Sequence, residues 1–289
     1  MKEVLTILIK RIKSDSGLMG PTHALSALAF ALMLTWLASD FMLKNIIGST
    51  NVVVFITAII IIIGSSLSPD FDAVKSTSIN TLGIIGIMLS KIMRAFSSMV
   101  QSLIKGPYDK DSDPHRGFWH TFIAAGLVGL MVSAITNINI KIFIVNNITL
   151  TVATLSVIFI VYISIQLVLA SLFKGFYKKT KNKFIGGLIM SGVSMLSTVM
   201  LVFSLPADLS YSWVGAAVTF GWITHLLGDM LTVSGVPILF PIKFKGKRWW
   251  NFRFPLGIKA GGYIEKTLLI PVFIIIIIFS LFKVIPILN

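Results

Sequence analysis

The sequence predicts an all-α membrane protein: a polytopic transmembrane helical bundle of about seven spans with an additional interfacial amphipathic helix. Of the 289 residues, 55% are hydrophobic and only 12% are charged, and the mean hydropathy is +0.91. A soluble domain carries about 25% charged residues. Several apolar runs reach the roughly 20 residues that a helix needs to cross about 30 Å of hydrocarbon. The bilayer is therefore the main solvent of this chain.

The predicted spans are apolar runs bounded by charged residues or turn residues. The segment 80–104 differs because Lys91 and Arg94 lie between apolar residues at helical spacing. This pattern predicts an amphipathic helix at the membrane surface. No linker or internal repeat is evident, so residues 1–289 are predicted to form a single domain. The spans are expected at 24–43, 52–68, 121–137, 148–173, 184–204, 213–233 and 267–286.

The basic residues predict the orientation. With these seven spans, 22 of the 25 Lys and Arg residues fall on one side of the membrane, and only Lys44, Lys141 and Lys283 fall on the other. Because cytoplasmic loops are enriched in Lys and Arg, we expect a multi-pass protein of the cell (inner) membrane with its N-terminus in the cytoplasm. This bias and the attraction to anionic lipids explain the net charge of +14. A nucleic-acid partner is not expected.

The four histidines are each predicted at the cytoplasmic end of a helix. His23 begins the first span, His115 and His120 flank the start of the third, and His225 lies in the second half of the sixth. The chain has no cysteine, so imidazoles and carboxylates are the strong metal ligands that remain. Four histidines gathered on one membrane face predict a metal site. For His23 alone, the alternative is an interfacial histidine after a Gly-Pro-Thr turn.

Three aspartates repeat this placement. Asp70 and Asp72 follow the second span, and Asp229 lies one turn beyond His225. A spacing of four residues puts His225 and Asp229 on one helix face, where both could reach one ion. The alternative for this pair is a hydrogen bond that fixes helix packing. If residues 70–72 are extended, their carboxylates point to opposite sides, and one could bind metal while the other orients an imidazole. Alternatively, Asp70 caps a helix and Asp72 pairs with Lys75.

The segment between the interfacial helix and the third span is predicted to turn sharply. Pro114 and Gly117 favour a loop that brings His115 and His120 together, although five residues separate them. Arg116 lies between them and offers a planar fork of donors suited to a phosphate or a carboxylate. The alternative is a His and Arg pair that touches lipid headgroups.

Three aromatic residues in a basic loop, Trp249, Trp250 and Phe252, are typical of anchors at the membrane interface.

Taken together, these segments resemble the YdjM-like family of membrane-bound metal-dependent hydrolases, which is similar to the superfamily of zinc-dependent phospholipases C and single-strand nucleases. The resemblance covers most of the chain and implies an all-helical metallo-phosphoesterase site. Gly228, the bulky Phe118 and Trp119 and a longer 80–110 segment depart from the family pattern. The matching pieces are Thr22-His23-Ala24, Ser68-Pro69-Asp70-Phe71-Asp72, His115-Arg116-Gly117 with His120-Thr121, the stretch His225 to Asp229 continuing through Leu231-Thr232, Gly235-Val236-Pro237 and Pro241, and a final Gly262 and Glu265.

The function that follows is a metal-dependent hydrolase at the cytoplasmic membrane face, acting on a phosphoester such as a phospholipid headgroup among its membrane lipids. Zinc is favoured by the imidazoles, and manganese or magnesium are the alternatives that the carboxylates would suit. Arg116 would neutralise phosphate charge, Asp72 is a candidate catalytic acid or base, and Glu265 is a candidate base or an acid that orients the metal ligands from behind. The expected metal ligands are His23 (as a ligand or as a residue that orients one), Asp70, His115, His120, His225 and Asp229.

Two other functions remain open at this point. A transporter or an ion- or proton-conducting protein would also place His and Asp near the membrane, but it predicts ionisable residues through the depth of the bilayer. A metal-sensing or scaffold protein would use the same ligands without turnover, because ligand spacing alone does not guarantee an open coordination position.

Overall fold

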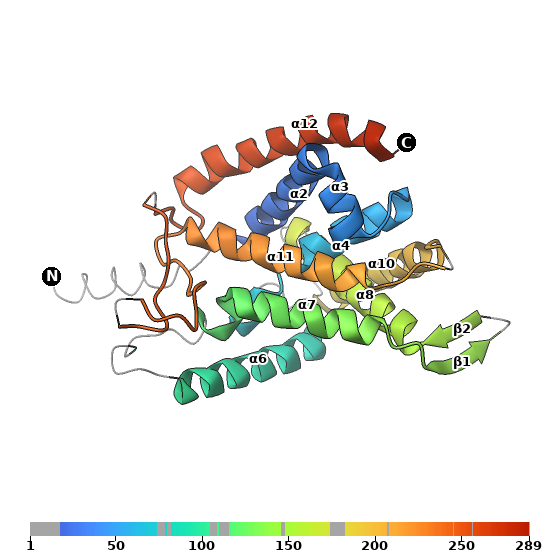
Figure 1. Ribbon diagram of the computed structural model, residues 1–289, viewed down its shortest axis with the longest axis horizontal. Helices are drawn as coiled ribbons and strands as arrows, with labels where there is room; N and C mark the ends of the chain where they lie inside the picture. Colours follow the sequence, from blue (N-terminus) through green and yellow to red (C-terminus); the bar gives the residue numbers. More distant parts are fainter. Residues whose placement is uncertain are drawn as a thin grey trace.

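The computed structural model is a bundle of α-helices with one small β-hairpin (Figure 1). The all-α polytopic prediction is confirmed. The structure describes residues 18–73, 79, 82–104, 109, 116–145, 148–173, 183–206, 208–244, 246–255 and 257–288. The main helices are α2 (Gly20–Leu37), α4 (Val52–Ser65), α6 (Gly83–Leu103), α7 (Phe122–Thr136), α8 (Val152–Leu172), α10 (Lys183–Phe203), α11 (Trp213–Met230) and α12 (Ile270–Leu288).

Short elements join these helices. After α2 come α3 (Ser39–Phe41) and a π-helical turn, η1 (Met42–Ile47), and another π-helical turn, η5 (Glu265–Leu269), leads into α12. Two 3₁₀ turns, η2 (Pro69–Asp72) and η4 (Phe118–His120), follow α4 and precede α7. Strands β1 (Lys141–Val145) and β2 (Ile148–Thr151) pair antiparallel, with Val145 opposite Ile148.

The hairpin corrects one predicted boundary. Residues 148–151 were expected inside a span, but they form β2, and the helix begins at Val152. Thr151 ends the strand and caps the helix, because its hydroxyl accepts a hydrogen bond from the backbone N–H of Thr154 at 3.1 Å. The sequence Ile-Thr-Leu-Thr is rich in β-branched residues, which suit a strand as well as an apolar span.

Helix α11 lies at the centre of the bundle and packs against α7, α4 and α2. Its crossing with α7 depends on glycine: a Cβ on Gly129 would clash with the Thr219 hydroxyl, and a Cβ on Gly215 would clash with the carbonyl oxygen of Gly129. Small residues let membrane helices approach closely. The two backbones therefore touch at this crossing.

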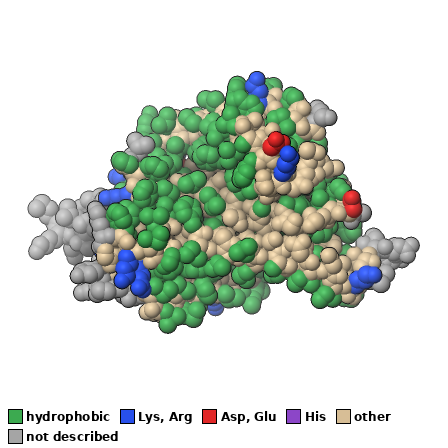
Figure 2. Space-filling model, viewed as in Figure 1, with side chains coloured by type: hydrophobic (Ala, Val, Ile, Leu, Met, Phe, Trp, Pro, Cys, Tyr) green, Lys and Arg blue, Asp and Glu red, His purple; other side chains and the backbone are tan. Residues whose placement is uncertain are grey.

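Six of the described helices are long and apolar enough to cross a membrane, by length and composition: Gly20–Leu37, Val52–Asp72, Gly83–Leu103, Val152–Leu172, Ile185–Phe203 and Glu265–Leu288. One of the six is Gly83–Leu103, for which the sequence predicted an amphipathic helix at the membrane surface. Two predicted spans correspond to helices outside the set, α7 with 15 residues and α11, which carries His225 and Asp229. Apolar side chains cover much of the face in Figure 2, and few charged ones interrupt them.

Helix α6 has its amphipathic faces reversed relative to a soluble protein. Its exposed residues include the apolar Ile84, Met88 and Ile92 and the charged Lys91 and Arg94, whereas the buried residues are small or polar apart from Met93. Exposed apolar side chains are unfavourable in water and favourable in lipid, and the two basic side chains among them suit the membrane surface. The buried residues on this helix are Gly86, Ser90, Met93, Ser97 and Gln101.

One end of the bundle collects chain segments that are far apart in the sequence. The starts of α7 and α12 and the end of α11 lie on the left of Figure 1, and the hairpin lies on the right. The start of α2 reaches the same left-hand end, because the backbone of Leu18 bonds to Asp229. The turn after α4 reaches it through its contact with η4.

Candidate metal centre

The end of α11 supplies two buried side chains, His225 (0% exposed) and Asp229 (1% exposed). The Nδ1 atom of His225 lies 2.8 Å from the carbonyl oxygen of Ser66. A carbonyl oxygen only accepts hydrogen bonds, so Nδ1 carries the proton and Nε2 keeps its lone pair. The last turn of α4 thus fixes the ring with Nε2 directed at the other ligand atoms.

Three further ligand atoms surround this Nε2. It lies 3.4 Å from Nε2 of His120, 3.6 Å from Oδ2 of Asp229 and 3.7 Å from Oδ1 of Asp70. His120 Nε2 is 3.8 Å from the same oxygen of Asp229 and 3.9 Å from that of Asp70. Four side chains from α4–η2, η4 and α11 therefore converge on one small volume.

These separations suit a divalent metal ion. Around a tetrahedral zinc with bonds of 2.0–2.1 Å, ligand atoms lie about 3.3–3.5 Å apart, slightly closer than the 3.4–3.9 Å between the two imidazole Nε2 atoms and from them to the two carboxylates. His120 and His225 are fully buried, and both rings present Nε2 to carboxylates. Imidazole and carboxylate are the donors that zinc takes, and carboxylate also suits manganese or magnesium. Among the described residues, the two groups able to hold an ion are His23, His225 and Asp229, and Asp70, His120 and His225.

Asp72 lies behind His120. Its Oδ2 is 3.7 Å from Nδ1 of His120, while Asp70 faces Nε2 of the same ring. Residues 69–72 form a 3₁₀ turn, since Pro69 favours the first turn of a helix, so the extended arrangement considered for residues 70–72 is not the one found. The turn still brings both carboxylates to opposite nitrogens of one imidazole. This pattern, a carboxylate behind a ligand histidine, orients metal ligands in many proteins.

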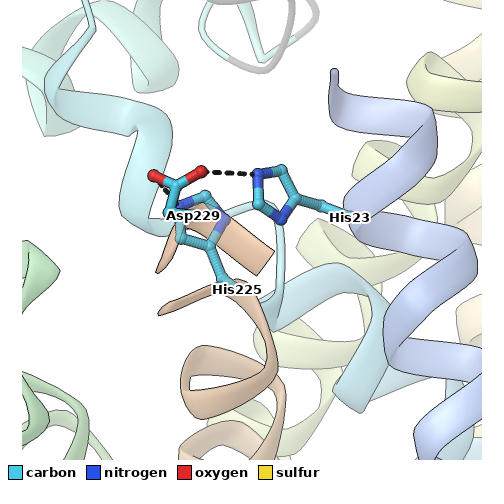
Figure 3. A group of neighbouring side chains, drawn as sticks. All are labelled: His23, His225 and Asp229. Carbon is cyan, nitrogen blue, oxygen red and sulfur yellow. Dashed lines mark ion pairs between the residues drawn. The ribbon is translucent and has the colours of Figure 1, made fainter. Parts of the chain in front are cut away.

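His23 approaches the centre from the start of α2 (Figure 3). Its Nε2 lies 3.2 Å from Oδ1 of Asp229, and its ring stacks on that of His225 with centroids 3.9 Å apart. A Cβ on Gly228 would lie 3.1 Å from two atoms of the His23 ring. Gly228 therefore lies directly under this histidine. The two oxygens of Asp229 face different partners, Oδ1 toward His23 and Oδ2 toward His120 and His225.

Arg116 is engaged within the protein. Its Nη2 lies 3.3 Å from Oδ2 of Asp229, and Nη1 donates to the carbonyl oxygen of Gly235 and to the hydroxyl of Thr232. The side chain is 2% exposed. The guanidinium group of Arg116, which the sequence suggested for a phosphate, therefore contacts Asp229 and the loop after α11.

Glu265 is fully buried at the start of η5. Its Oε1 accepts a hydrogen bond from the backbone N–H of Met19 at 2.8 Å, and its Oε2 accepts one from Gly261 at 2.6 Å. These contacts are with backbone groups and not with the ligand atoms. His115, the remaining predicted ligand, lies outside the described residues.

The turn that carries His120 is held by α6 and α11. The backbone N–H of Phe118 donates to the Ser97 hydroxyl at 3.2 Å, and Trp119 Nε1 donates to the carbonyl of Met93 at 2.7 Å. Trp222 Nε1 donates to the carbonyl of Trp119 at 2.8 Å. The sequence did not predict these hydrogen bonds or the one to Ser66, because in each of them the donor or the acceptor is a backbone group. Trp222 could have been singled out, because its indole lies three residues before His225 in the sequence.

The prediction that Trp249 is an interfacial anchor is wrong. This residue is 6% exposed and stacks on Phe240 at 4.2 Å, in a cluster with Phe118. Two aromatic neighbours fill the space beneath η4, so the indole is buried by the fold. Trp250 is half-buried and contacts Phe244 instead.

A helical bundle with an apolar exterior and a buried His–Asp cluster at one end defines a polytopic membrane protein with a candidate metal centre. The YdjM inner membrane protein family matches residues 18–285, so the chain belongs to that family. The cluster from His23 to Asp229 lies inside the match. The family and the apolar helices together define an inner-membrane, multi-pass protein.

The relatives are similar over a shorter stretch. Inner membrane protein YdjM of Escherichia coli (strain K12) is 32% identical over 71 residues, and so is inner membrane protein YdjM of Shigella flexneri. Each alignment covers 24% of this chain and spans 31% of the relative's length. No solved structure matches this chain.

Proposed function

We propose that this chain is a membrane-bound metal-dependent hydrolase that acts on a phosphoester, with a phospholipid headgroup as the preferred substrate class. The observation that carries the proposal is the convergence of the ligand atoms of His120, His225, Asp70 and Asp229, with separations of 3.4–3.9 Å around the two imidazoles. Bringing buried carboxylates and imidazoles together costs desolvation free energy that apolar packing would not. A bound cation offsets that cost.

The proposed ligands are His120, His225, Asp70 and Asp229, with zinc favoured and manganese or magnesium as alternatives. When bound, such an ion supplies Lewis-acid chemistry and makes a hydroxide nucleophile available at neutral pH. His115 is proposed as a further ligand on sequence grounds alone.

The surrounding residues orient these ligands. The Asp72 carboxylate faces Nδ1 of His120 at 3.7 Å, and the Ser66 carbonyl accepts a hydrogen bond from Nδ1 of His225 at 2.8 Å. His23 and Arg116 take opposite oxygens of Asp229. Because Asp72 is fully buried behind the ring, we assign it this orienting role in preference to proton transfer.

Substrate would approach past Asp70. Its side chain is 23% exposed, whereas those of the two histidines and Asp229 around it are at most 2% exposed. The loop after α11 exposes Lys243 and Lys247 beside the apolar Ile242 and Phe244, a mixture suited to anionic lipid headgroups. From the distribution of basic residues, we place this end at the cytoplasmic face.

The test combines metal content with activity in detergent-purified protein. Elemental analysis should find a bound divalent metal, and a headgroup-resolved lipid assay should detect released phosphoester. His225→Ala and Asp229→Ala should lose both, whereas Lys44→Ala, at the opposite end, should lose neither. Metal content that stays unchanged in both variants would reject the ligand assignment.

Transport, or ion or proton conduction, remains the alternative function. It requires ionisable residues through the depth of the bilayer, whereas in the described ranges the buried charged side chains belong to segments of one end: Asp72, Asp109, Arg116, Asp229 and Glu265. A liposome flux assay distinguishes the two. Flux of protons or metal ions with no hydrolysis would favour transport.

A further inference from the structure

We propose that Glu265 is a positioning residue for the metal centre: it holds the backbone at residues 18–19, and that backbone in turn fixes His23 and Asp229. The inference rests on the proposed function, because it gives Glu265 a task in the same centre. The carboxylate acts through the main chain of another segment, 246 residues away in the sequence.

The two oxygens of Glu265 each accept one backbone N–H. Met19 donates to Oε1 at 2.8 Å and Gly261 to Oε2 at 2.6 Å, and the side chain is fully buried. Hydrogen bonds to an ionised acceptor are short and roughly twice as strong as neutral ones. A buried carboxylate without such bonds is costly, so both contacts are expected to persist.

Met19 is the residue from which α2 starts. Its carbonyl oxygen accepts hydrogen bonds from Thr22 at 2.8 Å and from His23 at 3.1 Å, and no side chain caps the helix. Most helices begin with a Ser, Thr, Asp or Asn cap, and this helix lacks one. Glu265 accepts a hydrogen bond from the N–H of the N-cap residue itself, the bond that the Glu of a capping box makes from within the helix.

The residue before Met19 contacts the metal centre itself. The backbone N–H of Leu18 donates to Oδ1 of Asp229 at 3.2 Å, the same oxygen that faces His23 Nε2. Two successive N–H groups thus go to two different carboxylates, Asp229 and Glu265. A shift of the chain at residue 19 would move the Leu18 donor and the His23 ring together.

This junction also connects the outermost helix to the centre. The window of η5 and α12 that could span the membrane is only 17% buried, and α12 packs along α2, with Phe273 against Phe30 and Phe279 against Trp36. Glu265, at its start, is the fully buried carboxylate at this junction, and it reaches α2 directly. The register of α12 against α2 is thereby coupled to the geometry around Asp229.

The experiment compares Glu265→Ala and Glu265→Gln with Thr267→Ala as the control. Thr267 lies on the same turn, is exposed and bonds only locally, to the carbonyl of Tyr263. Zinc affinity is measured on the detergent-purified full chain by competition with a chromophoric chelator. Hydrogen exchange of a peptide covering residues 18–24 and the melting temperature are measured on the same samples.

Glu265→Ala should weaken zinc binding about ten- to a hundredfold, the usual range for residues that orient metal ligands, and should increase exchange at residues 18–24. Glu265→Gln should lie between this variant and wild type, because its amide offers one acceptor and not two. Thr267→Ala should match wild type. An unchanged zinc affinity in both Glu265 variants, with unchanged exchange at 18–24, overturns the proposal.

Two outcomes separate this proposal from the proposed function. If Glu265→Ala does not fold, Glu265→Gln decides: weaker zinc binding at an unchanged melting temperature supports the positioning role, and wild-type affinity overturns it. If wild-type protein binds no zinc, the metal assignment fails. Exchange at residues 18–24 then still tests whether Glu265 holds the start of α2, and no increase in Glu265→Ala overturns that.

Discussion

Two ion pairs at opposite ends of the bundle have nearly the same length and opposite surroundings. Lys44 and Asp40 are 3.5 Å apart with side chains 74% and 90% exposed, whereas Arg116 and Asp229 are 3.3 Å apart with both side chains 2% exposed. An exposed pair contributes little to stability. A buried pair costs desolvation free energy that its attraction need not recover. The difference indicates that the buried pair is kept for what Asp229 does beside His120 and His225.

The largest expected effect follows from breaking each pair in the same way. Asp229→Asn should destabilise the protein by about 3–5 kcal/mol, because Arg116 becomes an uncompensated buried charge, and should abolish zinc binding. Asp40→Asn should change neither property measurably. Thermal unfolding in detergent and metal analysis check both variants. Equal melting temperatures would show that burial makes no difference between the two pairs.

Metal removal should affect only the buried end. At a free zinc concentration a hundred times the dissociation constant, binding adds about 2.7 kcal/mol to the stability of the folded state. Chelation should therefore lower the melting temperature of wild type and of Asp40→Asn by the same amount, and should leave Asp229→Asn unchanged. Differential scanning fluorimetry with and without chelator measures this. A chelator effect retained in Asp229→Asn would place the ion elsewhere.

Asp72→Asn tests how the centre is supported from behind. The amide keeps the size of the carboxylate but loses its charge, so His120 should be held less firmly and zinc affinity should fall about ten- to a hundredfold. The loss should be smaller than in His120→Ala, which removes a ligand. Chelator competition gives both values. If the two variants lose affinity equally, Asp72 is itself a ligand.

The smallest expected effect comes from a methyl group at Gly228. Its Cβ would lie 3.1 Å from the His23 ring, so Gly228→Ala should push that ring by a few tenths of an ångström and weaken zinc binding by less than about tenfold, a cost below about 1.4 kcal/mol. Gly126→Ala is the matched control, since a Cβ there meets nothing within 4 Å. Equal affinities in both variants would exclude His23 from a role in binding.

The sequence predicted the parts of the molecule that depend on periodicity and spacing. The four-residue separation of His225 and Asp229 places both on one helix face, and alternation of spans brings His23 and His120 to the same end. The sequence did not predict what Arg116 contacts, because the carbonyl of Gly235 and the hydroxyl of Thr232 come from a loop whose path no local pattern fixes.

Backbone partners account for most of what was missed. The carbonyl of Ser66 fixes the proton of His225 on Nδ1. The start of α2 is held where the N–H of Met19 donates to Glu265. Every residue carries a carbonyl and every residue except proline carries an N–H, so these partners leave no mark in a sequence. The prediction for Trp249 was wrong for a related reason. The basic residues around it indicated the membrane interface, but its indole is buried by stacking on Phe240 across the loop.

The glycine crossing of α7 and α11 has a consequence at a distance. His120 immediately precedes α7 and His225 lies near the end of α11, so the spacing of these two helices influences the gap between the imidazoles. Gly215 lies ten residues, or about 15 Å along the helix axis, from His225. A single methyl group added there would wedge the helices apart, so in the proposed metal centre the selectivity among ions of different radius would depend in part on atoms that no ion contacts.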